Sequence, residues 1–237
     1  MGLILLNEYK AKRQLVIEAL CGVSGISKWP EIRFLRQSGF YIRFRARSLL
    51  IDPSNRKSGD YDGDVVYCTH KHSDHTGGVG NFLMRNPEAL LVGNRQVIDA
   101  LGEWRERAVE ARLGEELNFD EFSLEFVECE HGLFRGVVVY GVIVKSDGFT
   151  FGHCGDSVNL ERFGDKDLDM FALPISGIVA ASPNSAIEQL AKFKTPLPTI
   201  IPMHWLFRRP KSFCKQFQNK FPGGKCIIPE EGTIIPG

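Results

Sequence analysis

The stretch 69–78 reads THKHSDHTGG and holds three histidines and one aspartate within a few residues. Neutral imidazole nitrogens and carboxylate oxygens are donors that suit zinc and its first-row neighbours. The whole chain holds only six histidines, so chance clustering is a poor explanation of this loop. In preference to a polar surface turn, we therefore predict a metal site that includes His70, His72, Asp74 and His75.

The other donors of a hydrolytic metal site must lie further along the chain, because one loop supplies too few ligands. His131, Asp156 and His204 each stand at or just after the end of a segment that is expected to be a β-strand. Active-site loops of layered α/β folds gather at the carboxyl ends of strands. We therefore expect these three residues to join the histidine loop in one site.

The elements that position these residues are expected in two batches of strands, with helices between and after them. Short apolar runs rich in branched and aromatic residues predict the strands, and apolar spacings of three and four predict the helices. This pattern favours a layered α/β or α+β domain with two sheets. The expected strands are 32–35, 39–44, 48–52, 64–68, 90–93, 117–119, 122–128, 136–145, 149–154, 168–175, 199–203 and 225–228. The expected helices are 8–22, 79–85, 95–113, 185–193 and 212–221.

Composition and charge narrow the class of protein. The 237 residues include 29 basic and 29 acidic side chains, so no bulk field draws the chain toward nucleic acid or an anionic membrane. No segment approaches the ~20 apolar residues of a membrane span, and the apolar N-terminus is too short for a secretion signal. The six cysteines include no C-x-x-C pair. We therefore expect free thiols, a reducing compartment and a cytoplasmic protein.

The ordered set of candidate residues resembles the metallo-β-lactamase-fold hydrolases. Their pattern is an Asp at a strand end, then H-x-H-x-D-H, a distant His, an Asp in a G-D-[ST] turn and a final His. The early segment FLRQSGFYIRFRARSLLIDP also resembles the ascorbate-phosphate-lactonase-like branch, with Arg36-Gln37 where that branch usually carries Gly-His. All five parts of the superfamily pattern occur here in order: Asp52, then His70, His72, Asp74 and His75, then His131, Asp156 and His204.

This resemblance implies an α+β fold, a four-layer αββα sandwich with two mixed sheets packed face to face and helices outside. It implies one metallo-hydrolase domain over 32–237, with 1–31 as an N-terminal helical extension. Two divalent metal ions are the expected cofactors, with zinc first and manganese or iron as alternatives. By family role, His70, His72 and His131 hold the first metal, Asp74, His75 and His204 hold the second, and Asp156 bridges them.

The chemistry that the resemblance implies is hydrolysis. Two metals ~3.5–4 Å apart share a hydroxide whose pKa falls toward ~7, and they polarise the scissile group. Asp74 is the expected catalytic residue, because it lies beside that hydroxide and can take or hand on its proton. Asp52 is expected to orient the loop rather than to bind metal. The basic residues after the last ligand either hold an anionic group of the substrate or form a solvated turn: Arg208, Arg209 and Lys211.

The predicted function is hydrolysis of a small ester, lactone or phosphate ester, and this substrate can be an anion. The alternative within enzymes is a phosphodiesterase or nuclease of the same fold. Only 48 residues separate Asp156 from His204, too few for the inserted domain of the β-CASP nucleases. The balanced charge offers no obvious nucleic-acid groove, so a small molecule is the expected partner, and neither nucleic acid nor a membrane is. A metal-bound sensor or scaffold without turnover is the alternative from a different class, against which the intact ligand set argues.

Three cysteines have a regular relation to the predicted ligands, since Cys68, Cys129 and Cys154 each precede one by two residues. Strand alternation points each thiol toward the side that its ligand faces. The thiols are either small packing groups or redox-sensitive neighbours of a metal. Alternation places His153 on the opposite face from Cys154, with either a structural role or a contact to the substrate.

Overall fold

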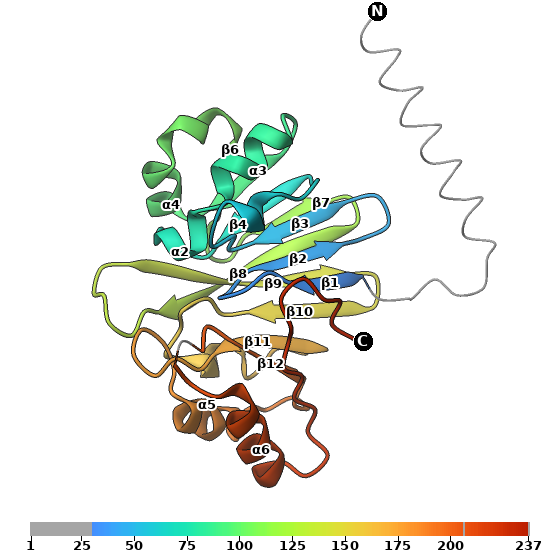
Figure 1. Cartoon of the computed structure of the whole chain (residues 1–237), viewed down its shortest axis with the longest axis vertical. Coiled ribbons are helices and arrows are strands. Elements are labelled where there is room, and N and C mark those ends of the chain that lie inside the picture. Colours follow the sequence, from blue (N-terminus) through green and yellow to red (C-terminus); the bar gives the residue numbers. More distant parts are fainter. Residues whose placement is uncertain (1–29, 206, 237) are drawn as a thin grey trace, which may run out of the picture.

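Two six-stranded β-sheets lie face to face in the computed structural model, with helices on both outer sides (Figure 1). The structure describes residues 30–205 and 207–236. The predicted four-layer α+β sandwich with two mixed sheets is confirmed. The predicted helix 8–22 lies outside the described residues, as does nearly all of the predicted extension 1–31. No helix in the described part of the chain is long and apolar enough to cross a membrane.

The first sheet has the order β1-β2-β3-β4-β5-β6. The first three strands pair antiparallel, and the last three add parallel to β3. Its strands are β1 (Glu31–Phe34), β2 (Phe40–Arg43), β3 (Ser48–Ile51), β4 (Val65–Cys68), β5 (Leu90–Gly93) and β6 (Ala108–Glu110). The connections carry the 3₁₀ turns η1 (Lys57–Gly59) and η2 (Gly102–Arg107) and the helices α2 (Ser73–Thr76), α3 (Val79–Arg85) and α4 (Arg95–Ala100).

The second sheet has the order β12-β11-β10-β9-β8-β7, antiparallel up to β10 and parallel from β10 to β12. Its strands are β7 (Glu116–Phe119), β8 (Phe122–Glu130), β9 (Val138–Ser146), β10 (Phe149–His153), β11 (Met170–Pro174) and β12 (Thr199–Met203). The 3₁₀ turn η3 (Leu160–Phe163) and the helices α5 (Pro183–Leu190) and α6 (Pro210–Lys220) complete this half.

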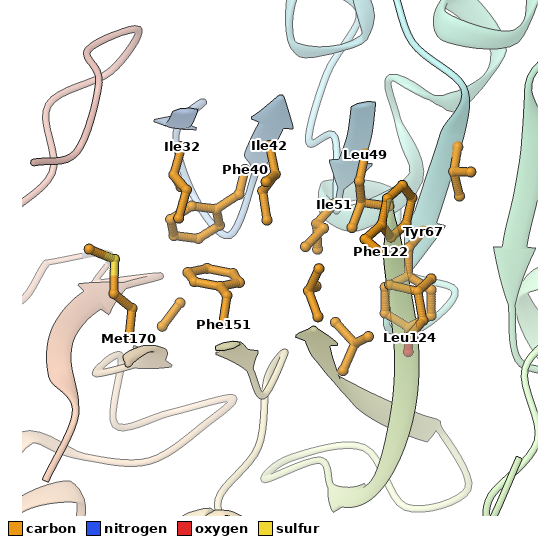
Figure 2. Packing of buried hydrophobic residues seen from close by; sticks show 14 of the residues in the cluster. Ile32, Phe40, Ile42, Leu49, Ile51, Tyr67, Phe122, Leu124, Phe151 and Met170 are labelled. Atoms are coloured by element: carbon orange, nitrogen blue, oxygen red, sulfur yellow. The ribbon is translucent and has the colours of Figure 1, made fainter. Parts of the chain in front are cut away.

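The core between the sheets consists of alternate residues from facing strands, because successive side chains of a strand point to opposite faces. Figure 2 shows side chains of the first sheet, among them Phe40 and Ile51, facing Phe151 and Leu124 of the second. The rings of Phe40 and Phe151 meet with their centroids 5.4 Å apart. Two further apolar clusters lie on the outer faces, one under α3 and α4 and one under α5 and α6. The three apolar layers hold both sheets in place, so that the carboxyl ends of β3, β4, β8, β10 and β12 meet at one edge.

The predicted helix 95–113 is wrong beyond its first two turns. Helix α4 ends at Ala100, a 3₁₀ turn follows, and 108–110 form the edge strand β6, paired with β5. Gly102 is a poor helix residue, and the unpaired edge of β5 offers hydrogen bonds that a continued helix would leave unmade. The helical spacing of Val97, Leu101 and Trp104 is therefore not a sign of one long helix.

The predicted strand 225–228 and the prediction of free thiols throughout are also wrong. In this segment only Cys226 pairs with a strand, through an isolated β-bridge to Ile200 of β12. Pro229 and the turn before Lys225 leave little room for further strand pairing. Cys214 of α6 forms a disulfide with Cys226. Packing of α6 beside this segment brings the two thiols together, which no C-x-x-C spacing announces. Because two of the cysteines form a disulfide, the cysteines do not favour a reducing compartment, and the cytoplasmic location stays a prediction.

Candidate metal centre

The histidine loop leaves β4 and enters α2 almost at once. His70 follows β4 after one residue, and His72 stands directly before α2 with an extended backbone. The hydroxyl of Thr76 donates to the His72 carbonyl at 3.1 Å and closes the single helical turn. This turn buries His75 completely, while Lys71 is exposed. Close spacing in sequence thus becomes convergence in space.

Three imidazoles form a first donor group. One ligand atom from each of His70, His72 and His131 lies within 4.8 Å of the others. Nε2 of His70 is 3.0 Å from Nδ1 of His72. Burial lowers the pKa of all three rings, most of all that of His70. The rings are therefore neutral near pH 7 and keep lone pairs for a cation.

Two carboxylates and two imidazoles form a second donor group: Asp74, His75, Asp156 and His204. Nε2 of His204 lies 3.2 Å from Oδ2 of Asp74 and 3.4 Å from Oδ2 of Asp156. Nε2 of His75 lies 3.4 Å from Oδ1 of Asp156. Asp156 also borders the first group, since its Oδ2 is 4.0 Å from Nε2 of His131. We call these seven residues the two donor groups, with Asp156 between them.

Charge is unusually concentrated around His75. Burial alone would lower the pKa of this ring, but the carboxylates of Asp52 and Asp156 raise that pKa well above 6.5. Burial alone would raise the pKa of Asp156, but the charge of His75 holds that pKa well below its usual range. Without a cation, a proton on His75 offsets the buried negative charge. A divalent cation in the second group would replace that proton.

The buried atoms of the two groups fit a cation better than they fit one another. Among the described residues, Nε2 of His75, Nε2 of His131 and Oδ1 of Asp156 are buried without a hydrogen-bond partner. The 3.4 Å contact of His75 with Asp156 therefore lacks hydrogen-bond geometry. Buried polar atoms without partners are rare in folded proteins. A metal ion would satisfy all three, so these residues fit the divalent cations that the sequence implies.

Asp52 supports a member of each group and is fully buried. Its Oδ2 lies 2.7 Å from Nδ1 of His75, and Oδ1 and Oδ2 accept hydrogen bonds from the backbone and hydroxyl of Thr69 at 2.8 and 2.7 Å. The same hydroxyl lies 3.1 Å from Nδ1 of His70. Such contacts fix the orientation of a ligand ring and raise its basicity. Asp52 thus orients the loop and lies behind the ligand atoms.

His204 is held by backbone contacts that the sequence did not reveal. It adopts a left-handed conformation (φ 44°), and its N–H donates to the carbonyl of Gln37 at 2.9 Å. Arg36 and Gln37 in the β1–β2 turn are also left-handed. The buried ring of His153 fixes this turn, because its Nε2 donates to the carbonyl of Ser38 at 2.8 Å. His153 therefore has a structural role, because it holds the turn whose Gln37 carbonyl accepts the N–H of His204.

The three basic residues after His204 are not part of the two donor groups. Nε of Arg208 donates to the carbonyl of Ser176 at 3.2 Å. Arg209 and Lys211 are exposed at the start of α6. Arg208 and Arg209 line a cleft of about 410 Å³ with residues of α5 and α6, and no donor-group residue is among its walls. Their predicted contact with substrate stays a prediction.

The three cysteines near the ligands are buried on the outer faces of the sheets. Cys68 packs under α3 and α4, and Cys129 and Cys154 pack under α5 and α6. Burial raises the pKa of each thiol, that of Cys129 to about 12. Protonated and enclosed, the thiols fill space as small apolar groups, which favours the packing interpretation.

Comparison with known proteins establishes the family. A model of the beta-lactamase superfamily domain matches residues 33–205. The chain belongs to this superfamily and has the metallo-β-lactamase fold. The predicted superfamily is confirmed, whereas the ascorbate-phosphate-lactonase-like branch stays a prediction.

Relatives and solved structures agree with this assignment. A UPF0173 metal-dependent hydrolase of Aeropyrum pernix is 27% identical over 238 residues, which is 87% of this chain and 95% of that protein. Igni18, a metallo hydrolase of Ignicoccus hospitalis, has a TM-score of 0.74 at 19% identity, covering 87% of this chain and 97% of its own. YhfI of Bacillus subtilis, a metallo-beta-lactamase fold protein, has a TM-score of 0.71 at 16% identity, covering 85% and 92%. The family match and the relatives support a metal-dependent hydrolase.

Proposed function

We propose that the chain is a dinuclear metal-dependent hydrolase of small esters, lactones or phosphate esters. The observation that carries this proposal is the pair of adjacent donor groups with the buried carboxylate of Asp156 between them. Zinc suits such ligands best, and manganese or iron are the alternatives. His70, His72 and His131 would hold one cation, Asp74, His75 and His204 would hold the other, and Asp156 would contribute to both.

When bound, two such cations act as Lewis acids and lower the pKa of a bound water toward ~7. The side chain of Asp74 is 43% exposed, so it meets solvent and an arriving substrate directly. Burial alone would raise the pKa of Asp74, but the hydrogen bond with His204 and the charge of His75 lower that pKa to about 2. A carboxylate of so low a pKa is ionised at neutral pH. It orients the attacking water by accepting its hydrogen bond, takes up the proton of that water briefly, and passes it to the leaving oxygen as the bond to that oxygen breaks.

Preorganisation is the second contribution of the chain. Asp52 and Thr69 fix the rings of His75 and His70, and the β1–β2 turn fixes the backbone of His204. A site held this way needs little rearrangement when a substrate arrives. Such rigid placement, with one partly exposed carboxylate, favours catalysis over the sensor or scaffold alternative.

The test is turnover by the full chain loaded with zinc or manganese. Substrates are p-nitrophenyl acetate, a γ-lactone, a thioester and bis-p-nitrophenyl phosphate, because one such site serves many scissile bonds. We expect turnover of at least one class and its loss on chelation. Asp74→Ala is expected to lower kcat/KM at least about a hundred-fold with the fold retained.

Asp99→Ala is the matched control, since this aspartate pairs with Arg95 and Arg105 on the surface of α4. It is expected to leave turnover within about two-fold of the unaltered chain. Turnover of the phosphodiester alone would favour the phosphodiesterase alternative. No turnover of any class by fully loaded protein would contradict the hydrolase proposal.

A further inference from the structure

Large apolar side chains are exposed on two loops beside the donor groups. Leu133, Phe134 and Ile178 are 55%, 47% and 55% exposed. The first two follow His131 at the end of β8, and the third lies in the loop after β11. We call these three residues the apolar rim. Apolar side chains that gather at the surface commonly mark a binding site.

Backbone contacts hold the two loops of the apolar rim against each other and against His131. The N–H of Gly132 donates to the carbonyl of Val179 at 2.9 Å. A Cβ at Gly132 would lie 2.8 Å from that oxygen, so only glycine permits this approach. The backbone nitrogens of Leu133 and Phe134 both lie 3.3 Å from Nδ1 of His131. The apolar rim is therefore fixed relative to the His131 ring.

The ring of Phe134 lies against two residues of the first donor group. Its centroid is 5.1 Å from that of His72, at an angle of 78°, and 5.2 Å from that of His131. Nearly half of this side chain nevertheless faces solvent. A molecule whose reacting bond lies at the first donor group is therefore within reach of the exposed part of Phe134.

The charge of the loop does not select a substrate. The segment 130–136 reads EHGLFRG, with Glu130 and Arg135 as its only formal charges, and both are exposed. These charges cancel, so apolar contact is the main attraction that this loop offers to a ligand.

We propose that the apolar rim binds an aliphatic or aromatic part of the substrate, with Phe134 as the specificity-determining residue. The substrate is then an amphipathic small molecule in which the hydrolysed bond adjoins an apolar group. This inference rests on the proposed hydrolase function for its turnover measurement, but not for its binding measurement. The competing explanation is that Phe134 only shields the rings of His72 and His131.

The turnover measurement compares p-nitrophenyl butyrate with p-nitrophenyl octanoate on the zinc-loaded full chain. A methylene fully removed from water contributes roughly a four-fold factor, so a surface that is about half open gives a little under two-fold for each of the four added methylenes. We expect kcat/KM to rise about ten-fold from butyrate to octanoate. In Phe134→Ser the ratio should fall to about two, while Phe134→Leu should keep most of it. Met84→Ser, which removes a 64% exposed side chain on α3, is the matched control and should keep the full ratio.

The binding measurement uses free butyrate and octanoate and needs no turnover. By calorimetry on the zinc-loaded chain, octanoate should bind about ten-fold more tightly than butyrate, and Phe134→Ser should lower this difference to about two-fold. If no substrate class is turned over but this binding pattern holds, the hydrolase proposal fails and the apolar rim stands. Equal binding of the two carboxylates would overturn the inference. So would a Phe134→Ser variant that loses affinity or kcat/KM equally for both chain lengths, because that is the effect of a shield.

Discussion

The two donor groups differ in charge, and that difference indicates how the centre works. The first group contains only neutral imidazoles, because burial lowers their pKa values. The second contains two carboxylates and a ring, His75, whose pKa is raised. Asp52 adds a third carboxylate directly behind that ring. The second group is therefore an anionic site that is supported from behind by Asp52, and the first group is a neutral site.

This contrast predicts unequal affinity for two chemically identical cations. Negative ligands attract a divalent cation more strongly than neutral ones at equal distance. We expect the second group to fill first and tightly, and the first group to fill later with help from Asp156. The first group also lies beside the apolar rim, through Phe134. The tight site then anchors the centre, and the weaker site lies nearest to the apolar part of the substrate.

Asp156→Asn should have the largest effect, because it removes the charge that both groups share while keeping the shape of the side chain. We expect affinity for both cations to fall and kcat/KM to drop at least about a thousand-fold. Elemental analysis together with kinetics measures both. Asp165→Asn, an exposed aspartate of the same half, is the control. Full retention of two cations by the Asp156 variant would remove the basis for the comparison.

Removing one ligand from each group should give different results. His131→Ala should lose the weaker cation and keep the tight one, so that stoichiometry falls by one. His204→Ala should weaken the tight cation by at least about ten-fold, since it takes a ligand from the anionic group. Calorimetric titration with zinc distinguishes the two outcomes. Identical titration curves for the two variants would show that the groups are equivalent.

Asp52→Ala tests whether support from behind the ligands matters as much as the ligands. Affinity for the tight cation should fall about 10- to 100-fold. The metal-free fold should also lose about 2–4 kcal/mol, because the hydrogen-bonding groups of Thr69 and His75 lose a buried partner. Chemical denaturation and zinc titration measure the two effects. Unchanged zinc affinity would mean that ring orientation does not limit binding.

A partly exposed cluster of charges shows how small the effect of an ordinary surface ion pair on stability is, compared with the buried charges of the two donor groups. Lys145 lies 2.9 Å from Glu116 and 2.8 Å from Glu125, all partly exposed. Lys145→Met should cost at most about 1 kcal/mol, because solvent screens such pairs. Folding lowers the pKa of both carboxyls. Their contribution is thus present above about pH 4.5 and is lost as the pH falls, so the difference in Tm should shrink between pH 7 and pH 3. A difference that grows toward low pH would contradict this sign.

The convergence of the seven donor residues was predictable because metal chemistry restricts residue type, and their binding of metal stays a prediction. Only a few side chains donate well to zinc, so His131, Asp156 and His204 stood out at strand ends without any structure. Strand positions along the chain followed from apolar runs with clear ends, such as 90–93 and 199–203, which the structure reproduces unchanged. Residue type and the periodicity of apolar residues were sufficient for prediction wherever a side chain had one dominant role.

The parts that could not be predicted depend on backbone groups or on packing between distant segments. The carbonyl of Gln37 holds His204, yet any residue has a carbonyl, so no residue type signals this contact. Strand β6 exists because β5 has a free edge, which cannot be seen in its own sequence. The disulfide of Cys214 with Cys226 depends on where α6 packs. Phe134 has the residue type of a core side chain, and only its exposure reveals another role.

Stepwise zinc titration of the metal-free full chain, followed by elemental analysis and turnover, tests the dinuclear proposal most directly. We expect two zinc ions per chain, the first bound at least about ten-fold more tightly than the second, with turnover appearing as the second binds. In His131→Ala one zinc ion per chain should still bind tightly, but turnover should be absent. A single equivalent at saturation, or full turnover with one zinc per chain, would contradict the proposal of two unequal sites acting together.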